Sequence, residues 1–275
     1  RHTDQTVNIY SAFLQNEWKN DRWGILIGGR LDKHNMVDNV IFSPRANLRF
    51  NPTQNINLRL SYSSGFRAPQ AFDEDMHIEN VGGTVAMIER AKDLKEEKSQ
   101  SFSVSADMYH RFGAFQTNLL IEGFYTRLTD VFVLGEPYDR GDGILVKTRS
   151  NGPGAKVMGL TLEGKVAYLS ILQIQAGLTL QRSRYDEPHK WHDDAPAEKK
   201  IFRTPDTYGY FTATYTPIKP LSIALSGTYT GRMLVQRMDI TAENAELGEM
   251  PERKAEAIRT PRFFDLGVKL AYDFK

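Results

Sequence analysis

The chain is most informative at first for what it lacks. Its 275 residues include no cysteine, so neither a disulfide nor a thiolate metal site is available. No stretch approaches the roughly 20 consecutive apolar residues that a transmembrane helix requires. The formal net charge is only +1, whereas neutralising many phosphates takes a clear excess of Lys and Arg. The sequence therefore predicts neither a helical membrane protein nor a nucleic-acid-binding protein.

Catalytic motifs are also missing. No glycine-rich loop follows a strand into a helix, and the serines lie on strand faces without suitably spaced His and Asp partners. We therefore predict no enzyme, no bound cofactor, and no catalytic or metal site with a defined ligand set. The chain opens on the polar stretch Arg1–Asp4, which is no signal peptide, so the chain is either mature or lacks its beginning.

A strand pattern fills most of the chain, and the segment Asn55–Pro69 shows it best. Apolar and aromatic residues alternate there with Asn, Arg and Ser, which is the period-2 pattern of a strand with one apolar face. Pro69 cannot donate to a ladder, and Gly65 relaxes the backbone before it, so the strand ends in a loop.

The same pattern predicts about eleven strands in one domain, residues 1–275. They are Val7–Leu14, Trp23–Leu31, Pro44–Phe50, Asn55–Pro69, Phe102–Phe112, Phe115–Val133, a strand from Ile144 to Tyr168 that is bulged at 151–154, Leu172–Gln181, Thr207–Thr216, Leu221–Tyr229 and Phe264–Phe274. The segment Thr241–Ile258 has some helical propensity, interrupted by Gly248 and Pro251.

Short and long connections alternate along the chain. Short turns are expected near Asn20, Asn51, Gly113, Ser170 and Pro217, and long loops near 32–42, 67–96, 134–143, 182–204 and 232–260. Spanning strands need only about 9–11 residues, and outer-membrane barrels have tight turns at one end and long loops at the other. We therefore predict an all-β fold, a transmembrane antiparallel β-barrel of the outer-membrane type.

The two parities of each strand differ in character. The polar parity, which would face the lumen, carries Arg59, Asp107, Glu163, Lys165 and Gln173. The other parity is aliphatic and would face lipid. Aromatic residues near strand ends suit interfacial girdles or, taken singly, a half-buried sheet; they are Trp18, Trp23, Phe66, Phe112, Phe115, Tyr168, Tyr215 and Tyr229.

An odd number of strands does not close a bacterial barrel, which has an even number, and a sheet in lipid cannot leave an edge unpaired. We therefore expect an incomplete portion of a larger barrel, truncated at both ends and prone to edge pairing on its own. Reading Phe274 as the terminal aromatic of a complete barrel is the alternative.

Several segments in order carry a family resemblance. The stretch Leu60–Pro69 resembles a strand-to-loop motif of TonB-dependent outer-membrane receptors, and Asp93–Ser99 is similar to that family's following segment, with Glu96 where proline is usual. The Phe124-Tyr125 pair with Asp130 and Asn151, the segment Gly159–Glu163, Arg203–Pro205 and Phe263–Gly267 resemble later parts of the same barrel.

This resemblance implies the C-terminal part of a barrel of about 22 strands, without the plug domain. It implies active import across the outer membrane of a scarce solute, a ferric siderophore, heme or cobalamin. The implied partners are outer-membrane lipid and the TonB energy-transducing complex, which would act through segments absent from this chain. A surface lipoprotein is a further candidate partner. The alternatives are a passive outer-membrane channel, a receptor of the glycan-importing branch, an outer-membrane barrel enzyme or a soluble all-β binding module.

Six residues are candidates for contact with the solute. Arg67 ends an apolar strand on the loop side, where it would face an anionic ligand, the plug or only the rim. His77 follows the acidic run 73–75, a composition that suits Ca²⁺ or a merely hydrated loop. The remaining four, His189, Trp191, His192 and Asp193, share one loop that would bind a metal, a ferric group or only water.

Overall fold

The computed structural model describes residues 6–69, 86–135, 138–141, 145–191, 195–240 and 253–274. Every regular element in these ranges is a β-strand. Among the described residues no helix is long and apolar enough to cross a membrane.

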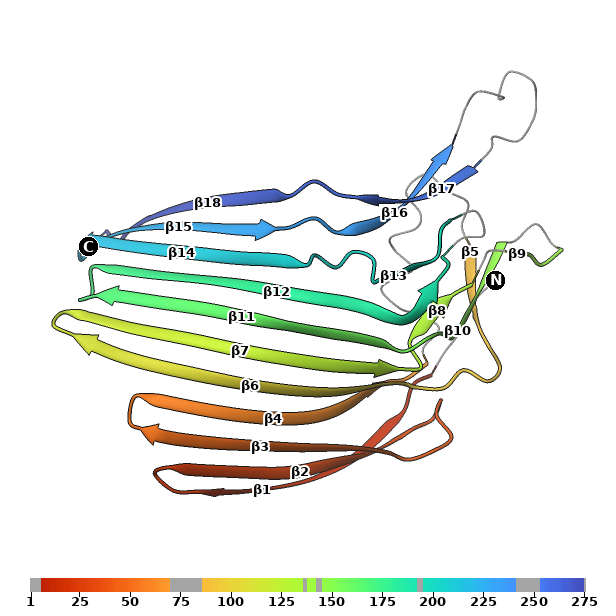
Figure 1. Ribbon diagram of the computed structural model, residues 1–275, viewed down its shortest axis with the longest axis horizontal. Coiled ribbons are helices and arrows are strands. Elements are labelled where there is room, and N and C mark those ends of the chain that lie inside the picture. The colour runs from red at the N-terminus through yellow and green to blue at the C-terminus, as the bar shows by residue number, and fades with distance from the viewer. Residues whose placement is uncertain are drawn as a thin grey trace.

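One large antiparallel sheet dominates the structure (Figure 1). Its strands follow one another in chain order, each paired with its neighbours, and β13 (Glu198–Lys200) pairs with β12 beside the main path. The path runs through β1 (Ile9–Lys19), β2 (Trp23–His34), β3 (Ile41–Thr53), β4 (Ile56–Arg67), β6 (Glu97–Phe112), β7 (Phe115–Thr129), β11 (Ala155–Tyr168), β12 (Leu172–His189), β14 (Thr207–Ile218), β15 (Leu221–Thr230) and β18 (Phe263–Tyr272).

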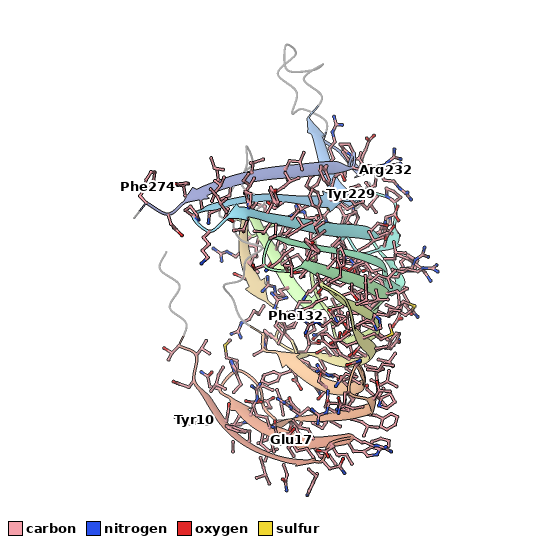
Figure 2. The ribbon with its side chains drawn as sticks, turned by 90° about the vertical axis from the view of Figure 1, so that its left-hand side faces the viewer. Tyr10, Glu17, Phe132, Tyr229, Arg232 and Phe274 are labelled. Atoms are coloured by element: carbon pink, nitrogen blue, oxygen red, sulfur yellow. The ribbon has the colours of Figure 1, made fainter. Side chains whose placement is uncertain are left out.

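The sheet is an incomplete barrel. Seen from its turn end it forms an arc, open between Tyr10 on β1 and Phe274 beyond β18 (Figure 2). Among the described residues, β1 pairs only with β2 and β18 only with β15. The all-β antiparallel barrel portion predicted from the alternation is confirmed.

The outward face of the sheet is apolar over a defined height. At the turn end, one row of residues in register across five strands consists of Phe112, Phe115, Tyr168, Leu172 and Tyr215. Ten positions further along the same strands, a second row contains Phe102, Tyr125 and Met158. At about 3.3 Å per residue and a tilt of about 40°, ten positions rise roughly 25 Å, the height of the apolar band of outer-membrane barrels. These rows are therefore the two aromatic girdles of the membrane zone.

The opposite, inward face carries the polar residues. Asn47 donates to Ser61 across β3 and β4 at 2.7 Å, and the hydroxyls of Thr161 and Thr179 lie 3.0 Å apart across β11 and β12. On β11, Lys165 lies 3.1 Å from Glu163, which accepts a hydrogen bond from the Tyr210 hydroxyl. Alternation thus places a hydrogen-bonded polar surface directly behind the lipid-facing one.

The connections differ between the two ends of the sheet, as Figure 1 shows. At the turn end, Gly113 adopts φ +58°, which glycine adopts more readily than other residues, and thereby links β6 to β7 in two residues. At the other end lie two further sheets. One contains β5 (Ala86–Arg90), β8 (Phe132–Leu134), β9 (Tyr138–Asp139) and β10 (Leu145–Asn151), and the other pairs β16 (Leu234–Ile240) with β17 (Arg253–Arg259).

Several predicted boundaries are wrong at this loop end. The stretch from Ile144 to Tyr168 is not one bulged strand, because β10 belongs to the small sheet and β11 to the large one. The predicted strand Phe115–Val133 ends at Thr129, and Asp130 then takes φ +55°. Residues 182–189, expected in a loop, continue β12, and residues 253–258, which have helical propensity, lie in β17. Outside the apolar band strands need no apolar face, so alternation does not mark them.

The close packing of Gly159 in β11 leads to a prediction about stability. A Cβ at Gly159 would lie 2.5 Å from the Leu180 carbonyl oxygen and 2.6 Å from Phe124 Cζ. We expect Gly159→Ala to lower the free energy of unfolding by about 1–3 kcal/mol, because overpacking displaces a neighbouring strand. Urea unfolding of the native-length protein in detergent measures this.

The matched control is Gly164→Ala in the same strand, where a Cβ meets nothing within 4 Å. It should unfold at the same urea concentration as the parent protein or slightly above it. If Gly159→Ala and Gly164→Ala lost the same free energy of unfolding, the close packing at Gly159 would be contradicted.

Candidate functional site

The small sheet at the loop end is the most elaborate feature inside the arc. Its strand β10 pairs in parallel with β5 and antiparallel with β8 and β9. Figure 2 shows Phe132 of β8 on the concave side of the large sheet. Residues from distant parts of the chain are thus gathered on the concave side of the large sheet at its loop end.

Asn151 joins three segments at the base of this small sheet. Its side-chain oxygen accepts from the backbone N–H of Lys95 at 2.8 Å. Its side-chain nitrogen donates to the carbonyl oxygens of Lys95 at 3.1 Å and Asp130 at 2.8 Å. One amide therefore fixes the segment before β6, the corner after β7 and the end of β10 relative to one another.

Arg67 lies at the junction of the two sheets. It is exposed at the end of β4, opposite Glu97 of β6, with its guanidinium carbon 5.5 Å from the ring centroid of Phe132. Glu97 in turn accepts a hydrogen bond from the backbone N–H of Phe132 at 3.0 Å. The contact between the cation and the ring face contributes about 0.5–1 kcal/mol at an exposed site. Arg67 is thus positioned by a residue, Phe132, that sequence reasoning did not single out.

Further cations lie on the small sheet or beside it. Arg90 donates to the Pro69 carbonyl oxygen at 3.2 Å, which ties β5 to the end of β4. Arg140 pairs with Glu89 at 3.0 Å, and Arg149 of β10 is fully buried. We call Arg67 and these three arginines the arginine group; Glu89 and Glu97 offset part of its charge, and Arg149 is buried. Its exposed cations suit an anionic ligand.

Below the arginine group, polar residues are buried at the end of β2. His34 is 0% exposed and its Nδ1 accepts from the Met36 backbone N–H at 3.0 Å. Asp32, also buried, accepts from Ser11 at 2.5 Å and from Arg30 Nε at 2.7 Å. Sequence reasoning missed both residues, because their burial depends on the chain that folds over them and not on local pattern.

His189 and Trp191 lie at the loop end of β12, several strands away from Arg67 on β4. His189 is the last residue of β12, with its ring 5.7 Å from that of Tyr185, and Trp191 meets Phe202 edge-on at 6.3 Å. Strands β6, β7 and β11 separate β12 from β4 in the sheet. The structure therefore does not bring these two aromatic side chains together with Arg67 along the sheet.

The other three candidates, His77, His192 and Asp193, lie outside the described residues. Within the described ranges, no three His, Asp or Glu side chains gather closely enough to hold a metal ion. Charge and hydrogen bonding are the chemistry that the described residues of the loop end offer.

Comparison with protein families gives one match over the whole chain. The family described as TonB dependent receptor-like, beta-barrel, matches residues 1–275. No curated protein sequence matches the chain.

Solved structures share the fold at low sequence identity. The siderophore receptor PirA from Acinetobacter baumannii is 15% identical with a TM-score of 0.68, and the comparison covers 98% of this chain and 40% of that one. The ferric enterobactin receptor PfeA from Pseudomonas aeruginosa is 16% identical with a TM-score of 0.68, covering 98% and 38%. The FrpB iron transporter from Neisseria meningitidis is 15% identical with a TM-score of 0.65, covering 97% and 38%. This chain thus spans about 40% of the length of such proteins.

The Asn151 junction leads to a prediction about hydrogen exchange. We expect Asn151→Ala to speed hydrogen exchange of the Lys95 amide about 30-fold in the native-length protein, because three hydrogen bonds of about 0.5–1.5 kcal/mol each are lost. Exchange monitored by mass spectrometry measures this.

Asn47→Ala serves as the control, since Asn47 donates to Ser61 within the large sheet. It should leave Lys95 exchange unchanged. Unaltered exchange at Lys95 in Asn151→Ala would show that the junction does not depend on this side chain.

His189 lies beyond the membrane zone, and its burial leads to a prediction about its pKa. Burial beside Tyr185 lowers the pKa of the imidazole below its usual value of about 6.5. The strand end is then fully stable above that usual value and loses stability as the pH falls through the lowered pKa. NMR titration of His189 should give a pKa below that of an unfolded peptide.

Tyr185→Ala should bring this pKa back toward the ordinary value, whereas Tyr168→Ala at the turn end should not change it. An unchanged His189 titration in Tyr185→Ala would contradict burial as the cause.

Proposed function

The chain belongs to the TonB-dependent receptor β-barrel family, and from this premise we propose that it is the barrel part of a receptor that actively imports a scarce solute. The family is one of transport receptors rather than enzymes, and its barrels lie in the cell outer membrane. The chain spans only about 40% of the solved receptors it resembles, so solute, energy source and partners of the whole protein are part of the proposal.

The observation that carries the proposal is the difference in polarity between the two faces of the large sheet. The outward face has an apolar band between aromatic rows, and the inward face is polar and hydrogen-bonded. Such a wall separates lipid from a hydrated interior wide enough for a large solute or a plug.

We propose a ferric siderophore as the solute, ahead of heme or cobalamin. The support is twofold. The arginine group at the loop end suits a chelate that carries negative charge. PirA, PfeA and FrpB, which share the fold, are named for siderophores or iron.

Import against a gradient needs energy, which the outer membrane cannot store. We propose that the TonB energy-transducing complex supplies it, through segments of the protein that this chain does not contain. The glycan-importing branch and a passive channel are outcomes that the following experiment distinguishes.

Prediction for transport. Cells producing the native-length receptor should accumulate a radiolabelled ferric siderophore only with TonB present and the proton-motive force intact. TonB-independent accumulation would indicate a passive channel. Binding of an oligosaccharide without binding of any ferric chelate, heme or cobalamin would indicate the glycan branch.

The arginine group gives a residue-level version of this test. Arg67→Gln and Arg140→Gln should each weaken chelate binding about 10-fold, or about 1.4 kcal/mol, because each removes one cation facing the ligand. Arg22→Gln, in the β1–β2 turn at the opposite end, should bind normally. Equal binding by all three variants would remove the arginine group from the solute site.

A further inference from the structure

A row of positive charges crosses four adjacent strands on the outward face of the sheet. In the register, Lys156 of β11 lies opposite Arg127 of β7 on one side and Arg184 of β12 on the other. Arg184 in turn lies opposite Lys200 of β13. Like charges directly opposite each other on neighbouring strands are destabilising, so this cationic row needs an explanation.

The direction of these side chains follows from unbroken register. The β7–β11 and β11–β12 ladders are continuous from Tyr168 to Ala155. Lys156 therefore has the same parity as Leu160 and Leu162, and Arg184 the same parity as Leu178 and Leu180, which are exposed on the lipid side. The cationic row points outward, away from the lumen where a solute would pass.

The height of the row places it at the outer membrane surface. Lys156 is twelve positions from Tyr168 in the turn-end aromatic row, as Arg184 is from Leu172. Twelve residues rise roughly 30 Å at a tilt of about 40°, slightly above a band about 25 Å tall. On β7, β11 and β12 the cationic row lies two residues beyond the outer aromatic row, at the height where lipid headgroups begin.

Acidic residues offset only part of this charge. Asp186 pairs with Arg127 at 2.7 Å and with Lys156 at 3.3 Å, and Asp206 pairs with Lys200 at 2.5 Å. Within the described part of the chain, the side chains of Arg184 and of Arg182, which lies just below it in the outer aromatic row, make no hydrogen bond or ion pair.

Space for a ligand exists beside these two arginines. Two adjoining cavities of about 300 and 310 Å³ lie between β12–β13 and the β16–β17 hairpin. Both are lined by Arg184, Lys200 and Arg259, one also by Arg182 and Asp206, and the other by Glu198 and Lys199. Each volume exceeds that of several water molecules, which take about 30 Å³ apiece. The lining is predominantly cationic and suits an oxyanion.

We propose that the cationic row, with Arg182, binds the phosphate groups of a phosphorylated glycolipid in the outer leaflet of the membrane. The inference rests on the outer-membrane location of the family but not on the solute that is imported. Asp186 and Asp206 partly neutralise three of these cations, Arg127, Lys156 and Lys200. The unneutralised charge comes from Arg182 and Arg184. Lipid chains of the same molecule would cover the apolar band below.

The test uses native-length protein stripped of lipid in a neutral detergent. Binding of lipid A carrying two phosphates is measured beside binding of the same glycolipid with its phosphates removed, and beside inorganic phosphate. We expect the phosphorylated form to bind and its affinity to fall with added salt. Arg182→Gln with Arg184→Gln should weaken it about 30-fold.

The matched control is Arg45→Gln, an exposed arginine of β3 on the inward parity, which should bind the glycolipid normally. Folding of each variant is checked by its urea midpoint, and ferric siderophore uptake should be the same in the double variant and the control. Uptake and lipid binding are separate readouts, so failure of one proposal is distinguishable from failure of the other.

Three outcomes would overturn the proposal. Equal binding of the dephosphorylated glycolipid would show that only acyl chains matter. Inorganic phosphate that binds as tightly as the glycolipid would show a free-anion site rather than a lipid site. Unchanged binding by the well-folded double variant would remove Arg182 and Arg184 from the contact.

Discussion

Backbone hydrogen bonding between neighbouring strands is the constraint on which the rest of this structure depends. Lipid offers no partner for an N–H or C=O group, so every such group in the membrane zone must be paired with the next strand. The long ladders show this: β11 is matched without a break to both β7 and β12 over its whole length. Because the register is fixed, each side chain is committed to one face, and the aromatic rows, the polar lumen and the cationic row all follow from it.

The two faces explain why the composition resembles that of a soluble protein. In a strand, every apolar residue directed to lipid is followed by a residue directed to the lumen, where polar groups such as Glu163, Lys165 and Gln175 bond to one another or to Tyr210. Mean hydropathy averages the two and falls to −0.46. The apolar surface is real but lies on one parity only, as the exposed Leu160, Leu162 and Val166 of β11 illustrate.

The membrane part of the fold could be read from the sequence, whereas the loop end could not. Alternation is a local signal, so strands such as Ile56–Arg67 and Phe263–Tyr272 were recognisable from their own residues. The small sheet has strands of two to seven residues that are polar or short, and β10 finds its partner β5 more than fifty residues away. At the candidate site, Arg67 was identifiable at a strand end, but its partner Phe132 and the buried pair Asp32 and His34 depend on tertiary packing. The Asn151 junction likewise links positions that no local pattern connects.

The separation of tight turns from elaborate connections has an evolutionary meaning. Among the described residues, contacts of Asn151, of Glu97 and of Arg90 with Pro69 tie the small sheet to the large one. Insertions or replacements within β5, β8, β9 or β10 need not shift any ladder of the large sheet. Sequence change at the loop end can therefore accumulate while the ladders of the large sheet, and with them its apolar band, are inherited unchanged.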